Sequence, residues 1–102
     1  MSIIYKYRIK LDMETESMYV NLPKGAKVFS LLLEDIDKAY VYAIVDPKEE
    51  EINKREVLWL GTGWHLSKEQ EIRISYYTFL GTYKLNDLIW HFWIEPDENF
   101  DF

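Results

Sequence analysis

Alternating apolar and polar side chains run along much of the chain, and this period of two is typical of half-buried β-strands. In residues 3–11, apolar or aromatic side chains fill the odd positions, and lysine or arginine fills three of the even ones. A second alternation over residues 18–22 ends at Pro23-Lys24-Gly25. A turn is expected there, because proline removes a backbone donor and glycine permits a positive φ.

Two pairs of predicted strands are separated by short polar segments that have the length of hairpin turns. Residues 26–34 and 39–45 are both rich in β-branched, leucine and aromatic side chains. Residues 76–84 and 88–94 flank the tripeptide Leu85-Asn86-Asp87. Each pair is therefore predicted to form an antiparallel hairpin.

The middle of the chain gives weaker signals. Residues 46–51 begin with Asp-Pro and continue as a charge run, which predicts an exposed loop because charges are costly to bury. A strand over residues 57–60 is expected to stop at Gly61-Thr62-Gly63. Residues 67–72 start with a serine that has the features of a helix N-cap, so one short helical turn is expected there.

Seven short strands with frequent turns, and no long period of 3.6 residues, predict an all-β, mainly antiparallel fold. The expected form is a small β-sandwich or a partly closed barrel. Residues 1–95 form the single predicted domain, and residues 96–102 form an acidic, aromatic C-terminal tail. Trp90 and Trp93 fall on opposite faces of one strand, which favours a homo-oligomer or an exposed binding surface.

The charge balance argues against nucleic acid as the default partner. The chain has 12 basic and 18 acidic residues, a net charge of −6. Because four acids lie after residue 94, residues 1–94 carry 12 basic and 14 acidic residues, or −2. Such a balance repels phosphate backbones unless the cations gather on one face. The sequence has no cysteine, no apolar run of membrane-spanning length and no signal peptide pattern, so the cytoplasm is the expected location.

Few motifs indicate catalysis. Gly61-Thr62-Gly63 resembles a phosphate-binding loop, but no Lys-Ser/Thr follows it, so a turn that ends a strand is the preferred interpretation. His65 and His91 are the only histidines and lack the spacing of paired metal ligands, so neither a metal nor a cofactor is expected. No serine lies in a nucleophile elbow. A hydrolase that uses paired carboxylates stays open, because sequence spacing does not show which acids meet.

The chain is rich in aromatic residues, with eight tyrosines and four tryptophans. Most of them must pack in the core of so small a domain. The side chains preferred as partner or ligand contacts are Tyr5, Tyr7, Trp64 and Trp93. The glycine turn and its neighbours complete the candidate set of binding residues: Gly61, Thr62, Gly63, Trp64 and His65.

The acidic tail has a phenylalanine tip, formed by Phe100 and Phe102. It looks like the partner-docking tails of single-stranded-DNA-binding proteins. Those tails follow a basic nucleic-acid-binding body, whereas this body is slightly acidic. A terminus without fixed structure is therefore preferred over a docking tail.

Five short strings occur in order along most of the chain. They are Ile4-Tyr5-Lys6-Tyr7, Leu22-Pro23-Lys24-Gly25-Ala26, Val45-Asp46-Pro47, Gly61-Thr62-Gly63 and Phe79-Leu80-Gly81-Thr82. Together they resemble a family of small uncharacterised tailed-bacteriophage proteins. The resemblance implies a phage gene product and brings no catalytic residues to transfer. The acids after Pro47 and the aromatic tail extend the family's pattern.

The leading hypothesis is a phage accessory protein that acts by stoichiometric binding in the host cytoplasm, as an inhibitor of a host defence protein. Its acidic surface would occlude a basic groove of the target. One alternative is an oligomer that sequesters a nucleotide signal in a pocket built from residues 61–65 at a subunit boundary. Another is a small nucleotide-processing hydrolase. Neither a membrane nor nucleic acid is an expected partner.

Overall fold

The structure is a computed structural model that describes residues 1–12, 14–15 and 17–97. The described part of the chain forms seven strands and one helix. In chain order they are β1 (Ile3–Ile9), β2 (Ser17–Pro23), β3 (Lys27–Asp35), β4 (Lys38–Val45), β5 (Ile52–Gly61), α1 (Lys68–Tyr76), β6 (Thr78–Leu85) and β7 (Leu88–Ile94). No helix in this part of the chain has the length and apolar character needed to cross a membrane.

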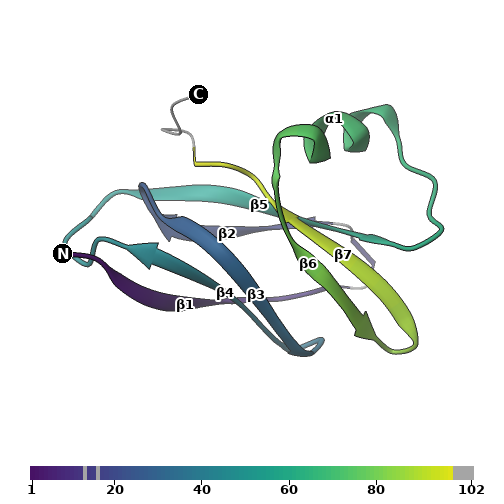
Figure 1. Cartoon of the computed structure of the whole chain (residues 1–102), viewed down its shortest axis with the longest axis horizontal. Helices are drawn as coiled ribbons and strands as arrows, with labels where there is room; N and C mark the ends of the chain where they lie inside the picture. The colour runs from purple at the N-terminus through teal and green to yellow at the C-terminus, as the bar shows by residue number, and fades with distance from the viewer. Residues whose placement is uncertain (13, 16, 98–102) are drawn as a thin grey trace.

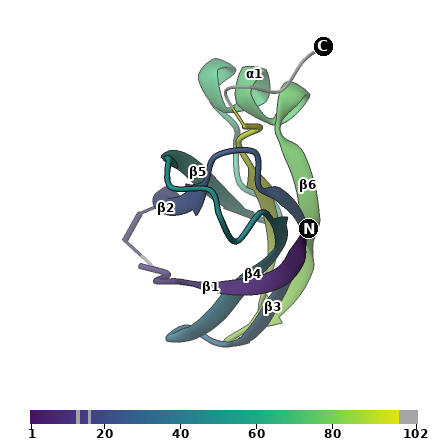
Figure 2. The same cartoon turned by 90° about the vertical axis from the view of Figure 1, so that its left-hand side faces the viewer.

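The strands form two antiparallel sheets. Sheet A has the order β1-β4-β3, and sheet B has the order β2-β5-β7-β6. Figures 1 and 2 show the sheets facing each other across the interior, with α1 on the side of sheet B, away from β1 and β4. The predicted all-β, mainly antiparallel fold is confirmed, and the arrangement is that of a small β-sandwich. A hydrogen bond from the Tyr83 hydroxyl to the carbonyl of Leu31 ties β6 to β3.

The core between the sheets pairs small side chains with large ones. The inward positions of β4 carry alanine or valine, and Ala39, Val41 and Ala43 are fully buried. Sheet B supplies the bulk, because Trp59 and Phe92 are among the largest fully buried side chains and their ring centroids lie 6.3 Å apart. Complementary sizes across facing sheets allow dense packing without voids.

Both predicted hairpins are present. The β3–β4 pair closes through a two-residue loop between Asp35 and Lys38. The β6–β7 pair closes through Asn86 and Asp87, whose φ angles are 51° and 64°. Positive φ at both central residues matches the right-handed strand twist, and asparagine and aspartate adopt it most readily after glycine.

Two elements are longer than the sequence predicts. β5 begins at Ile52 rather than residue 57, and α1 covers nine residues rather than one turn. The sequence did not predict the start of β5, because this part of the strand is polar. The side chains of Asn53, Arg55 and Glu56 are nevertheless buried, because they find hydrogen-bond partners inside the fold. Ser67 is the N-cap of α1, as predicted, and forms a capping box with Gln70.

The alternation in β1 sets the faces correctly but overstates the burial. Ile9 is fully buried and Tyr7 is half-buried, whereas Tyr5 and Ile3 are 56% and 39% exposed. All four face the interior, because they pair with inward residues of β4. β1 is the edge strand of sheet A, so it has a neighbouring strand on one side only, which is consistent with this exposure.

Candidate binding surface

The predicted site residues fall on both sheets. Tyr5 and Tyr7 lie on β1 in sheet A, with ring centroids 5.4 Å apart in an edge contact. Tyr7 packs against the core, and burial, together with the neighbouring Tyr5, raises its pKa above the ordinary value. The glycine turn and Trp93 belong to sheet B. The structure therefore does not bring the predicted residues together in one site.

The glycine turn ends β5, as the preferred interpretation required. The amide of Thr62 donates to the carbonyl of Ile89 at 3.0 Å, and the amide of Trp64 donates to the carbonyl of Gly61 at 3.2 Å. Two amides that an anion would need are thus already used. The geometry is that of a turn that fixes the end of a strand.

Trp64 packs over this turn. Its ring lies edge-on to Trp90, with centroids 5.1 Å apart, and it is 40% exposed. A Cβ at Gly61 would lie 2.7 Å from the Trp64 ring, which explains why glycine occupies that position. His65, the next residue, is exposed.

His91 links the turn to the strands beside it. Its Nε2 atom lies 2.7 Å from the Thr62 hydroxyl and its Nδ1 atom 2.9 Å from the Thr82 hydroxyl. Both ring nitrogens are thus occupied by hydroxyl groups. Trp93 lies beside it, with ring centroids 6.4 Å apart, and in turn contacts Phe79 at 5.3 Å. The described residues contain no group of three or more His, Cys, Asp or Glu side chains placed to hold a metal ion.

The predicted docking residues Phe100 and Phe102 lie outside the described residues. The chain just before them contacts the domain, because the Asp97 carboxylate accepts hydrogen bonds from the amide of Gly25 at 2.8 Å and the side chain of Asn53 at 3.2 Å. Burial lowers the pKa of Arg55 close by, and the carboxylates of Asp97 and Glu95 oppose that shift.

A buried carboxylate that sequence reasoning missed fixes α1 to sheet B. Glu56 is only 4% exposed. Its carboxylate accepts a hydrogen bond from the Tyr77 hydroxyl at 2.7 Å and forms an ion pair with Arg73 at 3.2 Å. Arg73 also pairs with the exposed Glu69. Burial, followed by the hydrogen bond to Glu56, raises the pKa of Tyr77 well above its ordinary value. No sequence pattern identified these partners, because they are 17 and 21 residues away from Glu56.

The two sheets differ in how their outer faces are covered. On the outer face of sheet B, Leu58 and Leu60 are 1% and 3% exposed, and Glu56 is held by the α1 region. Beyond the charged residues Asp35 and Lys38 at its hairpin end, the outer face of sheet A is formed by three residues from each strand, and none of them is buried. They are Ile4, Lys6 and Arg8 on β1, Tyr40, Tyr42 and Ile44 on β4, and Lys27, Ser30 and Leu32 on β3.

This face presents a substantial apolar surface. Ile4, Leu32 and Ile44 are 64%, 41% and 39% exposed, and Tyr40 and Tyr42 are half-buried between them. Phe29, at the register shift between Val28 and Ser30 on β3, is 51% exposed, and no paired position assigns it to either face. Adjoining exposed apolar side chains on a small domain mark an interaction site more often than single ones do.

Three cations stand on the same face. The Lys6 ammonium lies 4.8 Å from the centroid of the Tyr40 ring, and Arg8 donates to the backbone carbonyl of Asp37 at 2.9 Å. In the described chain, no carboxylate forms an ion pair with Lys6, Arg8 or Lys27. Their charges are therefore not neutralised by an ion pair among the described residues.

Comparison with known proteins gives one match. A family model described as Domain of unknown function (DUF7352) matches residues 1–101. No curated protein and no solved structure matches the chain.

Proposed function

The chain belongs to the DUF7352 family, and we propose that it acts by stoichiometric binding of a protein partner through the outer face of sheet A. The observation that carries this proposal is the contrast between the two sheets. Residues at the centre of the outer face of sheet B are buried, whereas every residue of the outer face of sheet A is at least partly exposed.

The composition of this face supports a protein partner. Two tyrosines lie at its centre on β4, and three exposed aliphatic side chains surround them. Tyrosine, arginine and large apolar residues are enriched at the centres of protein interfaces. The face is part of a regular sheet that is anchored to the core, so it would be presented with little loss of conformational entropy on binding.

The proposed biological setting is a bacterial cell infected by a phage. The five strings that resemble tailed-bacteriophage proteins support a phage accessory protein in the host cytoplasm. A host defence protein inhibited by occlusion is the proposed partner. The family description names no source and no activity, so the sequence resemblance alone supports this setting.

Affinity capture with a control variant tests the function. The tagged protein would be incubated with a lysate of phage-infected bacteria, and the bound material analysed by native mass spectrometry. We expect one host protein in a fixed molar ratio. The double variant Leu32→Ser/Ile44→Ser should lose it, because both side chains are exposed on the proposed surface.

Ile72→Ser is the matched control, because Ile72 is 61% exposed on α1, on the side of sheet B. It should retain the partner. Circular dichroism and thermal melting would establish that all variants fold. Recovery of the same partner by the sheet A variant, or recovery of no partner in a fixed ratio, would refute the proposed function.

A further inference from the structure

The cations on the outer face of sheet A have no counter-charge in the described chain, although the protein is acidic overall. We infer that the partner contacts this face with an acidic protein segment that also carries apolar side chains. The inference rests on the proposed function and specifies the chemistry of the partner. It reverses the sign expected from net charge alone, which predicts a basic groove on the target.

The arrangement of the charges on the face supports this partner. Lys6 and Arg8 stand on β1 and Lys27 stands on β3, so the cations lie on the two edge strands. Tyr40, Tyr42 and Ile44 of β4 lie between these strands, and the Lys6 ammonium reaches over the Tyr40 ring. An apolar centre with a charged rim is the usual construction of a protein interface. Carboxylates at the two edges of the partner segment would meet the cations while its apolar side chains cover β4.

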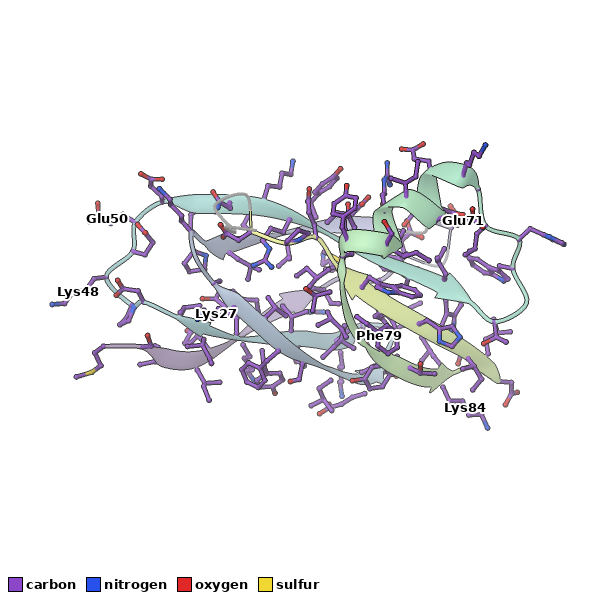
Figure 3. All side chains as sticks on the ribbon, turned by 45° about the horizontal axis from the view of Figure 1, so that its top comes forward. Lys27, Lys48, Glu50, Glu71, Phe79 and Lys84 are labelled. Carbon is purple, nitrogen blue, oxygen red and sulfur yellow. The ribbon has the colours of Figure 1, made fainter. Side chains whose placement is uncertain are left out.

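Asp35 lies opposite Lys38 at the hairpin end of this sheet, and other acidic groups lie farther away. Figure 3 shows Glu50 in the β4–β5 loop and Glu71 on α1 at opposite ends of the molecule, with Lys27 between them. The net charge of −6 therefore hides a face of opposite sign. Complementary local charge, rather than total charge, sets partner choice and orientation at contact distance.

A second copy of the chain fits this face less well. A two-fold interface places the same patch on both sides of the contact. Two copies stacked through sheet A would then bring Lys6, Arg8 and Lys27 near the same cations of the other copy. Like charges across an interface oppose association, and the one carboxylate that the register places on this face, Asp35, lies opposite Lys38 at the hairpin end.

Single-stranded nucleic acid fits less well for a different reason. Three cations on a protein with a net charge of −6 give weak attraction for a polyanion. Base-stacking platforms use exposed aromatic faces, whereas Tyr40 and Tyr42 of this face are half-buried and the exposed apolar side chains beside them, Ile4, Leu32 and Ile44, are aliphatic. These aliphatic groups match the side chains of a protein segment.

Selection from a random peptide library tests the inference. Displayed random 12-residue peptides would be selected against the immobilised wild-type protein, and the enriched sequences read out by deep sequencing. We expect enrichment of peptides that combine aspartate or glutamate with apolar residues. The affinity of an enriched peptide should fall by about tenfold in Lys6→Glu/Arg8→Glu and should weaken as salt is raised.

Lys54→Glu is the matched control. Lys54 lies 5.2 Å above the ring of Tyr19 on sheet B, as Lys6 lies above Tyr40 on sheet A. The control makes the same change of charge at a cation over a tyrosine, and it should leave the affinity within about twofold of wild type. Enriched peptides without an acidic bias, no enrichment, or equal loss in both variants would overturn the inference.

Two further experiments test nucleic acid and a second copy of the chain as alternative partners of this face. A 20-nucleotide thymidine oligomer retained at moderate salt and released by Lys6→Glu/Arg8→Glu would overturn the inference in favour of nucleic acid. A dimer in native mass spectrometry that the same variant disrupts would overturn it in favour of a second copy. A captured partner that is lost on Leu32→Ser/Ile44→Ser and kept on the charge reversal would refute the acidic partner while leaving the proposed function intact.

Discussion

Glu56 is the buried carboxylate through which Arg73 of α1 and Tyr77, its C-cap, are joined to sheet B. Its carboxylate is nearly inaccessible, and the groups that satisfy it, Tyr77 and Arg73, come from the C-terminal end of the α1 region. A buried carboxylate costs free energy unless it is paired and hydrogen-bonded. Removing it would leave the Tyr77 phenol without its acceptor and the Arg73 guanidinium with Glu69 alone.

Glu56→Ala should lower the free energy of unfolding by about 2 kcal/mol, at the low end for a buried pair because Arg73 is partly exposed and can regain water. The control is Glu69→Ala, which removes the other carboxylate of Arg73 from a site that is 72% exposed. It should cost less than about 0.5 kcal/mol. Urea denaturation of both variants checks this, and equal losses would contradict the role given to Glu56.

Tyr77 predicts a loss of stability in alkali. Its ordinary pKa is 10.0, and burial raises the value in the folded protein. Below pH 10 the phenol is protonated in both states, so it contributes no pH dependence. Above that pH the unfolded chain loses the proton first, and the free energy of unfolding should fall by about 1.4 kcal/mol per pH unit. Tyr7 and Tyr83, whose pKa values are also raised by burial, add to the decline.

Denaturation midpoints between pH 9 and 11 measure this slope. Tyr77→Phe should make the slope shallower, while costing about 1 kcal/mol at neutral pH through the lost hydrogen bond to Glu56. A variant with the wild-type slope would show that the Tyr77 phenol ionises equally readily in the folded and unfolded states.

At the scale of elements, the sequence predicted the hairpins, because their turns depend on local residues. It missed the start of β5, because that part of the strand depends on residues distant in sequence. The β6–β7 turn was readable because Asn86 and Asp87 tolerate positive φ by themselves. The start of β5 was not readable, because Arg55 is buried only by virtue of carbonyl groups of Ala26 and Glu95, which are distant in sequence. A run of polar residues is predicted as a loop when the hydrogen-bond partners that would bury it are distant in sequence.

α1 is the element that depends least on the core. None of its residues is buried, and its described anchor to sheet B is the ion pair between Arg73 and Glu56. Short helices without a buried face are marginal on their own. α1 should therefore open locally without unfolding of the sandwich.

Native-state hydrogen exchange checks this expectation. Amides of α1 should exchange at least about tenfold faster than hydrogen-bonded amides of β5 and β7, and faster still in Glu56→Ala. Exchange of α1 at the rate of the central strands in both proteins would show that the helix and the sandwich open only together.

At the scale of the whole molecule, the two sheets differ in how far their outer faces are covered. Sheet B is covered at its centre on both faces, whereas sheet A is covered on one face only. The sequence could not assign these faces, because both faces of β4 are apolar: alanine and valine alternate with Tyr40, Tyr42 and Ile44. Tyr5 and Tyr7 were placed on the correct strand, but they point inward, and the surface proposed here is on the opposite side of β1.

We expect the outer face of sheet A to be covered by the partner in the complex. Hydroxyl-radical footprinting of the protein, free and in the captured complex, tests it most directly, because the method reads side-chain exposure. We expect lower labelling of Tyr40, Tyr42 and Leu32 in the complex, and unchanged labelling of Tyr19 and Phe79 on sheet B. Protection of the sheet B residues with unchanged labelling of the sheet A residues would contradict this expectation.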